Sequence, residues 1–330
     1  MKYVENYSND PKYNLAFEEY CFKNLSRDED YVILWINGPA IIVGKNQNTA
    51  EEINGKYVEE NNIKVVRRVT GGGAVYHDLG NLNFSIITNL NGNRVIDFKK
   101  YNIPILKALE KLGVNCELSG RNDITIDGKK FSGIAQSIWK DRVLNHGTLL
   151  FDTKLDVLSK ALNVKKDKIE SKGIKSVKSR VTNIKPYIKE DIDMEEFRSL
   201  LLKYIFEMEG FTPEKYELSE EEKASIDKLY REKYSTWEWN YGKSPKFNLK
   251  NYKRFSFGAL DIRLDVKGGI IQDCKIFGDF FGAEDVKDLE DKLKGKRYDR
   301  GSLSIELEDE DLIKYFGNIT LEEFIDLIFV

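Results

Sequence analysis

The sequence is poor in the residues that support metal and redox chemistry. In 330 residues it contains two histidines, His77 and His146, and three cysteines, Cys21, Cys116 and Cys274. No two cysteines form a C-x-x-C pair, and neither histidine lies near a cysteine in the sequence. A zinc site made of cysteine and histidine is therefore not expected, and the odd cysteine count argues against a disulfide framework. The thiols are expected to be small buried groups of low reactivity, and a reducing cytoplasm is the simplest setting for them.

The sequence also lacks long apolar runs and an excess of charge of either sign. No stretch approaches the roughly 20 apolar residues that span a bilayer. Residues 1–10 have neither the apolar core of a signal peptide nor the Arg-rich character of a transit peptide. Lys and Arg number 52, Asp and Glu number 55, and the formal net charge is -3. These observations predict a cytoplasmic protein, expected to be a monomer, with no global reason to bind nucleic acid or a membrane surface.

Several familiar catalytic and nucleotide-binding motifs are missing as well. No G-x-S-x-G nucleophile motif occurs, and no G-x-G-x-x-G opens a helix after the first strand. Gly44 and Lys45 are similar to the end of a P-loop, but Asn46 replaces the Ser or Thr, and Gly38 lies one residue too far upstream. Serine hydrolase, dinucleotide-binding and P-loop chemistry are thereby disfavoured.

The apolar residues that are present, 41% of the chain, are spaced as in a mixture of helices and short strands. Helices are expected over residues 12–26, 98–112, 193–209 and 219–233, and strands over residues 31–36, 40–43, 63–68 and 83–88. Asp127-Gly128, flanked by strand-like residues, predicts a hairpin. This irregular alternation favours an α+β fold with a mixed, largely antiparallel sheet and flanking helices over a doubly wound parallel sheet.

The length of the chain suggests more than one domain, since single cores rarely exceed about 250–300 residues. Residues 235–245 break the regular pattern and are the candidate boundary between a catalytic domain, 1–245, and a small α/β accessory domain, 246–330. In the latter, residues 254–266 and 270–281 predict a hairpin around Lys267-Gly268-Gly269, followed by two helical patterns.

Three short segments contain the candidate chemistry. Gly71, Gly72 and Gly73 follow the paired Arg67 and Arg68. Glycines alone often mark a tight turn, and paired arginines often mark a solvated strand end. Backbone without Cβ atoms also approaches ligands closely, however, and a neighbouring arginine can bind phosphate or carboxylate oxygens.

Lys130 follows the predicted hairpin turn, on the strand face opposite Phe131, where it faces either solvent or a cleft. Residues 172–183 form a basic stretch, which is either a solvated loop or a mobile loop that closes over an anionic ligand.

Taken together and in order, these segments resemble the lipoate–protein ligase A family of the biotin/lipoate ligase superfamily. The resemblance is carried by residues 14–19 (NLAFEE), 43–48 (VGKNQN), 67–78 (RRVTGGGAVYHD), 81–84 (NLNF), 120–123 (GRND), 130–135 (KFSGIA), 146–150 (HGTLL), 172–183 and 237–242 (WEWNYG). These segments cover most of the first 245 residues, and the C-terminal part is similar more loosely.

The resemblance implies an enzyme that activates lipoate with ATP, releasing pyrophosphate, and then transfers the lipoyl group from lipoyl-AMP to a lysine of a carrier protein. It implies ATP as co-substrate, Mg²⁺ as the metal and lipoate as substrate, without a bound redox cofactor. The implied acceptors are the lipoyl domains of 2-oxoacid dehydrogenase E2 subunits and the H protein of glycine cleavage.

The family roles transfer to matching positions in this sequence. Lys130 corresponds to the catalytic lysine that contacts both lipoate and nucleotide. The nucleotide-binding positions are Arg68, Gly73, Ala74, Val75, Tyr76 and Lys130; those for lipoate are Gly72, His77 and Lys130; those near the adenylate are Asn122, Asp123, Lys178 and Arg180. Asp123 is also the implied ligand of Mg²⁺.

Other functions of the same fold remain open at this point. One is an octanoyl or lipoyl transferase, although none of the three cysteines lies in the matched motifs after Asn122, and the C-terminal part favours a ligase. Another is an inactive lipoate-binding paralogue, which the presence of Lys130 and Arg68 disfavours. A biotin–protein ligase is more distant, because its glycine-rich motif differs.

Overall fold

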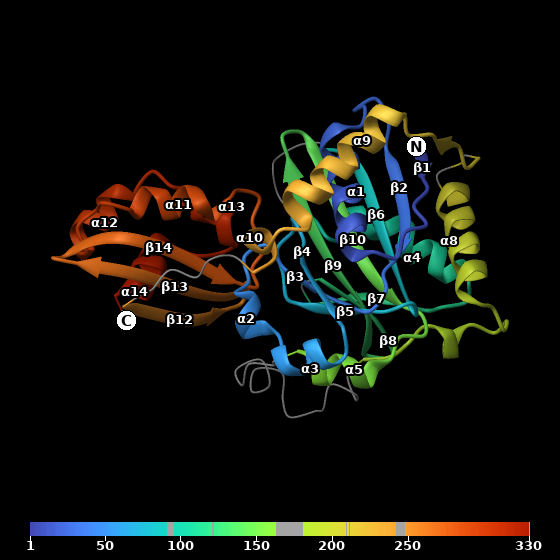
Figure 1. Cartoon of the computed structure of the whole chain (residues 1–330), viewed down its shortest axis with the longest axis horizontal. Coiled ribbons are helices and arrows are strands. Elements are labelled where there is room, and N and C mark those ends of the chain that lie inside the picture. Colours follow the sequence, from blue (N-terminus) through green and yellow to red (C-terminus); the bar gives the residue numbers. More distant parts are fainter. Residues whose placement is uncertain are drawn as a thin grey trace.

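The computed structural model comprises a large N-terminal body and a smaller C-terminal body (Figure 1). It describes residues 1–90, 96–120, 122–162, 181–208, 210, 212–241 and 248–329. The predicted boundary at residue 245 lies outside these ranges and stays a prediction. Upstream of it, in the stretch expected to be irregular, the helix α10 (Trp237–Asn240) forms.

An eight-stranded sheet is the framework of the large body, with strands in the order β11-β1-β2-β6-β10-β9-β8-β7. Their bounds are β1 Lys2–Val4, β2 Tyr31–Ile36, β6 Asn81–Asn89, β7 Glu117–Ser119, β8 Asp123–Ile126, β9 Lys129–Trp139, β10 Arg142–Leu150 and β11 Lys215–Tyr216. Only β1 pairs in parallel, with β2 and β11, and the other pairs are antiparallel. The prediction of a mixed, largely antiparallel sheet is confirmed.

Helices cover both faces of this sheet, which explains why β2 is apolar throughout. Val32 and Leu34 point to a core shared with α4 (Ile103–Lys111) and α8 (Met194–Met208). The alternate residues of β2 pack with α1 (Pro11–Asn24) and α9 (Glu220–Leu229) on the other face. A strand buried on both faces has no reason to alternate with polar residues. The same covered sheet therefore places α1 directly behind β2, where it borders the cavity described below.

A smaller sheet lies beside α1 and contains the glycine segment. Its strands, in the order β4-β3-β5, are β4 Lys64–Arg67, β3 Ala40–Val43 and β5 Val75–His77. Helices α2 (Thr49–Glu52) and α3 (Gly55–Glu60) connect β3 to β4. The seven residues from Arg68 to Ala74, here called the glycine loop, connect β4 to β5.

The structure departs from the elements predicted over residues 98–112, 219–233 and 254–266. The helix expected over residues 98–112 is a 3-10 turn, Lys100–Asn102, followed by α4, and that over residues 219–233 is α9 followed by a π turn, Tyr230–Tyr234. The strand expected over residues 254–266 was wrong, because β12 (Leu249–Phe255) turns back at Ser256–Phe257 into β13 (Gly258–Lys267). The turn was missed because Ser256-Phe257 contains none of the Gly, Asn or Asp residues that mark a two-residue hairpin turn. The hairpin at Asp127-Gly128 is confirmed, with φ values of 50° and 72°.

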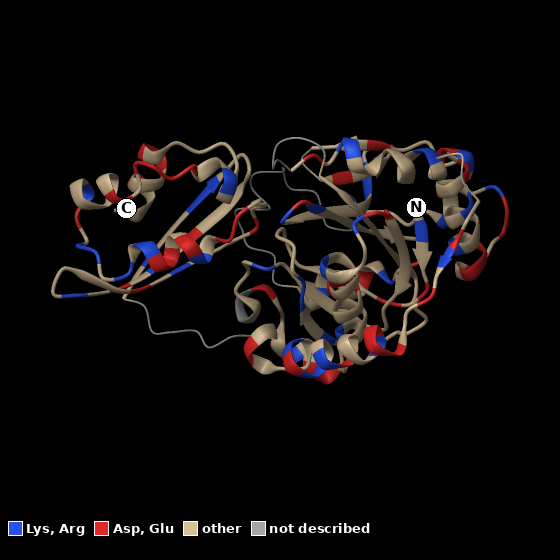
Figure 2. Cartoon of the chain, turned by 90° about the horizontal axis from the view of Figure 1, so that it is seen from above, with Lys and Arg blue, Asp and Glu red and all other residues tan. Residues whose placement is uncertain are grey.

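The small body has its own core, built on the sheet β12-β13-β14, where β14 is Ile270–Gly278. Four helices cover one face in place of the two expected: α11 Val286–Leu293, α12 Arg300–Glu306, α13 Leu312–Phe316 and α14 Leu321–Ile328. The remaining short helices of the large body are α5 Leu155–Ala161 and the 3-10 turn Lys185–Tyr187. Basic and acidic residues are interspersed along the ribbons of both bodies (Figure 2). No helix in the described ranges is long and apolar enough to cross a bilayer.

Candidate active site

A cavity of about 110 Å³ lies in the large body between the two sheets. It is lined by α1, both sheets and the glycine loop through Leu15, Trp35, Ile42, Arg68, Gly73, Ala74, Val75, His77, Asn83, Asn122, Lys130, Gly133, Ile134, Ala135, His146, Gly147 and Thr148. Seven of the residues predicted to bind ligand are therefore brought together from three separate parts of the sequence, residues 67–78, 120–123 and 130–135. Gly72, Tyr76 and Asp123 do not line the cavity, although each neighbours a residue that does.

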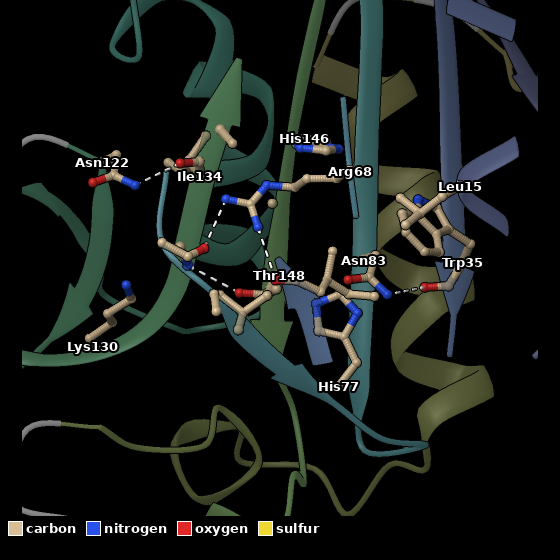
Figure 3. Close-up of a pocket in the computed structure, with 17 residues that line it drawn as sticks. Leu15, Trp35, Arg68, His77, Asn83, Asn122, Lys130, Ile134, His146 and Thr148 are labelled. Atoms are coloured by element: carbon tan, nitrogen blue, oxygen red, sulfur yellow. Dashed lines mark hydrogen bonds between the residues drawn. The ribbon is translucent and has the colours of Figure 1, made fainter. Parts of the chain in front are cut away.

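The lining of the cavity is mixed: Lys130 and Asn122 lie on one side with Ile134, and Leu15 and Trp35 lie on the other with Asn83 and His77 (Figure 3). Arg68 and Thr148 lie between the two sides. A narrow cavity with an ammonium group near one end and aromatic and aliphatic walls at the other suits a ligand with an anionic head and an apolar tail.

Arg68 shapes the glycine loop through hydrogen bonds to its backbone. Its Nη2 donates to the carbonyl oxygens of Gly71, at 2.6 Å, and Gly73, at 2.9 Å, and its Nε donates to Thr70 Oγ1 at 2.9 Å. Burial lowers the pKa of the Arg68 guanidinium to about 10, so it stays charged at neutral pH. Most of its donors are thus engaged by the loop, and Arg68 contributes a fixed positive charge at the cavity wall.

Arg67 is not exposed to solvent at the end of its strand, and it does not line the cavity. Its guanidinium is buried and donates to the carbonyl oxygens of Gly44, Lys45, Gln47 and Trp239. It also donates to Thr49 Oγ1 and Asn240 O. Arg67 therefore connects β4 to the segment after β3 and to α10, and this explains why an arginine pair, rather than a single arginine, precedes the glycines.

The small body contacts the glycine loop directly. Gly72 N donates to Phe280 O at 3.2 Å, and a Cβ atom on Gly71 would lie 2.3 Å from that same carbonyl oxygen. Gly72 has φ +91°, and a Cβ there would lie 2.6 Å from the ring of Phe281. The absence of side chains at Gly71 and Gly72 is thus explained by close packing with the C-terminal body, a requirement that is invisible in the local sequence.

Lys130 and Asp123 form an ion pair at one side of the cavity. Lys130 Nζ lies 2.6 Å from Asp123 Oδ1, and their side chains are 36% and 23% exposed. Asn122 is held in place by Ile134, because its Nδ2 donates to Ile134 O at 2.7 Å, and Ile134 N donates back to Asn122 O. The β8–β9 hairpin therefore presents the ammonium group at the cavity, with a carboxylate beside it.

A buried polar network lies behind the glycine loop. Thr70 Oγ1 is 2.7 Å from His146 Nε2, and His146 Nδ1 is 2.8 Å from Glu18 Oε1. Ser85 Oγ donates to the same Glu18 oxygen at 2.5 Å. The negative charge of buried Glu18 favours the charged form of Arg68, raising its pKa against the larger effect of burial. This network connects α1 and the main sheet to the glycine loop through hydrogen bonds.

The remaining predicted residues have distinct positions. His77 is buried at the cavity wall, and burial lowers its pKa to about 3, so its imidazole is neutral at neutral pH. Tyr76 points into the core beneath the small sheet, and burial raises its pKa to about 12. Lys178 and Arg180 lie outside the described residues, as does most of the basic stretch at 172–183.

Sequence reasoning missed the residues that form the aromatic and aliphatic wall of the cavity and its support. Leu15, Trp35 and Glu18 lie in segments with no glycine or charge cluster to mark them, although Leu15 and Glu18 belong to a motif that carried the resemblance. His146 was considered as a metal ligand and as part of a motif that carried the resemblance, but it was given no role in ligand binding. The low number of histidines could have drawn attention to His146. The 330-residue chain has only two histidines, and both line this cavity.

Replacing Gly44 with alanine is expected to displace the glycine loop. A Cβ atom on Gly44 would lie 2.0 Å from Gly72 O, so one backbone segment must move. Overpacking of this kind costs about 1–3 kcal/mol. We expect a lower midpoint of thermal unfolding, measured by circular dichroism, and weaker ligand binding in the cavity, measured by calorimetry.

Gly55→Ala is the matched control for this prediction. Gly55 is the first residue of α3, and a Cβ there meets nothing within 4 Å. Because alanine favours helices more than glycine does, this variant should be as stable as the unaltered protein or slightly more stable. Equal stability of the two variants would show that Gly44 does not need to be a glycine.

Comparison with known protein families identifies two matching segments. Residues 10–206 match the family described as lipoyl protein ligase A/B catalytic domain. Residues 244–328 match the family described as bacterial lipoate protein ligase C-terminus. The cavity lies within the first of these segments.

Individual proteins are similar to this chain in sequence and in structure. The lipoate-protein ligase LplJ of Bacillus subtilis (strain 168) is 54% identical over 332 residues, which cover 100% of both proteins. Among solved structures, P. falciparum LipL1 in complex with lipoate has a TM-score of 0.78 and 29% identity, covering 98% of this chain and 97% of that one. A lipoate-protein ligase A bound with ATP has a TM-score of 0.64 and 28% identity, covering 73% and 98%.

Proposed function

This chain belongs to the lipoate–protein ligase family, and from that premise we propose that it is an ATP-dependent ligase that attaches lipoate to a lysine of carrier proteins. The observation that carries the proposal is the cavity, which combines the Lys130 ammonium group at one end with the apolar walls of Leu15, Trp35 and Ile42. Lipoate matches this arrangement, since it consists of a carboxylate, a short aliphatic chain and an apolar dithiolane ring.

In the first half-reaction, an oxygen of the lipoate carboxylate attacks the α-phosphorus of ATP. The bond from that phosphorus to the bridging oxygen breaks, pyrophosphate leaves, and lipoyl-AMP forms. Lys130 is positioned to neutralise charge on the carboxylate and α-phosphate as they approach each other. Asp123 is 2.6 Å from Lys130 Nζ, and the ammonium group has three N–H donors, so it retains donors for the anionic substrate while paired with Asp123.

In the second half-reaction, the amine of an acceptor lysine attacks the carbonyl carbon of lipoyl-AMP. The bond to the phosphate oxygen breaks, AMP leaves, the amine loses a proton, and an amide forms. We propose the lipoyl domains of 2-oxoacid dehydrogenase E2 subunits and the glycine-cleavage H protein as acceptors, since the family resemblance implies them.

The described residues offer little to hold Mg²⁺ without substrate. They contain no group of three His, Cys, Asp or Glu side chains able to hold a metal ion, and Asp123 is already paired with Lys130. Magnesium commonly binds one or two carboxylates together with substrate phosphates. We therefore propose that Mg²⁺ arrives with ATP, with the phosphates as its main ligands.

The test is lipoylation of a purified carrier domain by the full chain, measured by mass spectrometry. With lipoate, ATP and Mg²⁺, the carrier should gain one lipoyl group, and pyrophosphate should be released. Without ATP, neither should occur. A carrier domain in which arginine replaces the target lysine is the control, and with it pyrophosphate release should stop after about one turnover.

Two results would refute the proposal. Acyl transfer from an acylated carrier in the absence of ATP would identify a transferase of the same fold. Binding of lipoate without pyrophosphate release, under conditions where a known ligase is active, would identify a binding paralogue.

A further inference from the structure

Three asparagines from the N-terminal part of the chain lead by hydrogen bonds to His77. Asn6 Nδ2 donates to Asn14 Oδ1 at 2.9 Å, and Asn14 Nδ2 donates to Asn37 Oδ1 at 2.8 Å. Asn37 Nδ2 then lies 3.0 Å from His77 Nδ1. All three asparagines are buried, and none of them lines the cavity. The mechanism proposed above assigns them no part.

Backbone groups determine which way each amide points. Asn6 Oδ1 accepts from the backbone N–H of Ser8 at 3.0 Å, so the NH₂ group of Asn6 must face Asn14. Asn14 Nδ2 also donates to the carbonyl oxygens of Ser8, at 2.8 Å, and Ile36, at 3.0 Å. Because a carbonyl oxygen only accepts, the atom of Asn14 beside them must be nitrogen. The atom of Asn37 that faces it must therefore be oxygen.

The orientation of Asn37 then decides the tautomer of His77. With its oxygen toward Asn14, Asn37 presents its NH₂ group to His77 Nδ1, so Nδ1 must accept. A neutral imidazole with Nδ1 as acceptor carries its proton on Nε2. Neutrality follows from the full burial of the ring, which lowers the pKa of His77 to about 3.

The Nε2–H group of His77 has no partner among the described residues, although it is buried. Such a group is unusual in a folded protein and calls for an explanation. The ring lines the cavity and contacts Trp35 edge to face at 6.4 Å between centroids, on the side of the cavity opposite Lys130 (Figure 3). The unpaired donor is therefore at the end that receives the tail of the ligand.

His146, the other histidine at the cavity, differs in this respect. Its Nδ1 faces the Glu18 carboxylate, which only accepts, so Nδ1 carries the proton when the ring is neutral. Its Nε2 then accepts from Thr70 Oγ1–H, while Thr70 Oγ1 accepts from Arg68 Nε. Both nitrogens of His146 are thus partnered, and the ring carries a proton on Nδ1, the nitrogen that accepts in His77.

We propose that the Nε2–H of His77 is a specificity determinant that favours acyl substrates with a hydrogen-bond acceptor near the tail, such as a dithiolane sulfur, over saturated fatty acids of equal chain length. This inference rests on the proposed function. A saturated chain leaves the buried donor unpaired, whereas a sulfur atom at that depth accepts its hydrogen bond. Sulfur is a weak acceptor, so the discrimination is modest.

The tautomer can be measured directly in the native full chain. Only two histidines exist, so ¹⁵N-histidine labelling yields two imidazoles in a long-range ¹H–¹⁵N spectrum. We expect one imidazole that is the Nε2–H tautomer and disappears in His77→Phe, and one with a proton on Nδ1, which remains. Lipoate should shift the His77 Hε2 resonance, and octanoate should not. A proton on Nδ1 of His77 would overturn the proposal without the need for any variant.

The second measurement is the ratio of kcat/KM for lipoate to kcat/KM for octanoate. His77→Phe retains an aromatic ring but removes the donor, and it should lower this ratio roughly 3- to 10-fold, as expected for one weak hydrogen bond. Tyr7→Phe is the control, because it removes a hydrogen-bonding group from an aromatic ring that is 70% exposed and does not line the cavity, and its ratio should stay within about twofold of the native value.

An unchanged ratio in His77→Phe would overturn the proposal, as would an equal fall in both variants. These outcomes differ from failure of the proposed function, in which the native chain activates neither acid with ATP. If His77→Phe does not fold, the spectrum of the native chain with and without lipoate still decides the matter.

Discussion

Lys130→Ala is expected to lower the rate of pyrophosphate release at least about 100- to 1000-fold, the range seen when one group that stabilises transition-state charge is removed. Lys130 Nζ is the ammonium group at one side of the cavity, where the carboxylate and the α-phosphate must approach each other. Without it, two anions meet with no fixed positive charge from the hairpin between them. The measurement is single-turnover formation of lipoyl-AMP together with pyrophosphate release.

Lys129 provides the matched control, because it is the neighbouring lysine on the same strand. It is exposed and does not line the cavity, since successive side chains of a strand point to opposite faces. Lys129→Ala should therefore have nearly native activity. The unfolding midpoint should be similar in both variants, because neither lysine is buried.

A low rate of pyrophosphate release by Lys130→Ala could also result from the Asp123 carboxylate that it leaves unpaired. A further variant distinguishes the two explanations. Removing Lys130 leaves the Asp123 carboxylate without its partner at 2.6 Å, and that carboxylate would repel an anionic substrate. The double variant Lys130→Ala, Asp123→Asn removes this repulsion. If its rate stays low, the ammonium group itself is required; recovery to near the native rate would refute the catalytic role of Lys130.

Arg67→Met is expected to destabilise the large body by about 3–5 kcal/mol, because several buried acceptors lose their donor at once and each costs about 1–3 kcal/mol when left unpaired. The Arg67 guanidinium donates to the backbone carbonyls of Gly44, Lys45, Gln47 and Trp239. Methionine preserves much of the side-chain length but offers no donor. Arg67→Lys, with three donors, should lie between Arg67→Met and the native protein.

The measurement is the unfolding midpoint followed by near-UV circular dichroism, with Arg231→Met as control. Arg231 is exposed in the π turn after α9, so its loss should change stability by less than about 0.5 kcal/mol. A native midpoint for Arg67→Met would mean that water or other side chains satisfy these carbonyls. The ATP affinity of any folded Arg67→Met protein should also fall, since the segment after β3 supports the glycine loop: Lys45 N donates to Thr70 O.

The contacts of Arg67 and Arg68 could be predicted only in part from the residues next to them in the sequence. Next to three glycines, the pair was interpreted as a phosphate or carboxylate clamp or as a solvated strand end. In the structure both guanidinium groups are buried and donate mainly to backbone carbonyls, and only Arg68 lines the cavity. The partners of Arg67 lie as far away in sequence as Trp239 and Asn240, so no local pattern could predict them.

Strands and turns that depend on residue patterns within a single short segment were predicted well. The strands over residues 31–36 and 40–43 have the predicted bounds, and the Asp127-Gly128 turn has the positive φ values that its sequence requires. The error at Ser256–Phe257 has a reason too, since this tight turn contains none of the Gly, Asn or Asp residues that mark such turns in a sequence.

By itself, the sequence determined the small numbers of cysteines and histidines, the α+β composition and, through the order of its motifs, the resemblance to a family. These properties depend on residue types and on spacings within one element, where helix and strand periodicity act. The tertiary structure alone decided which distant residues meet: Phe280 and Phe281 against Gly71 and Gly72, and Asn6, Asn14 and Asn37 behind His77. Which atom of each side chain donates, and which accepts, depends on every group along the series of hydrogen bonds. The nitrogen of His77 that carries the proton can therefore be inferred only from the folded structure.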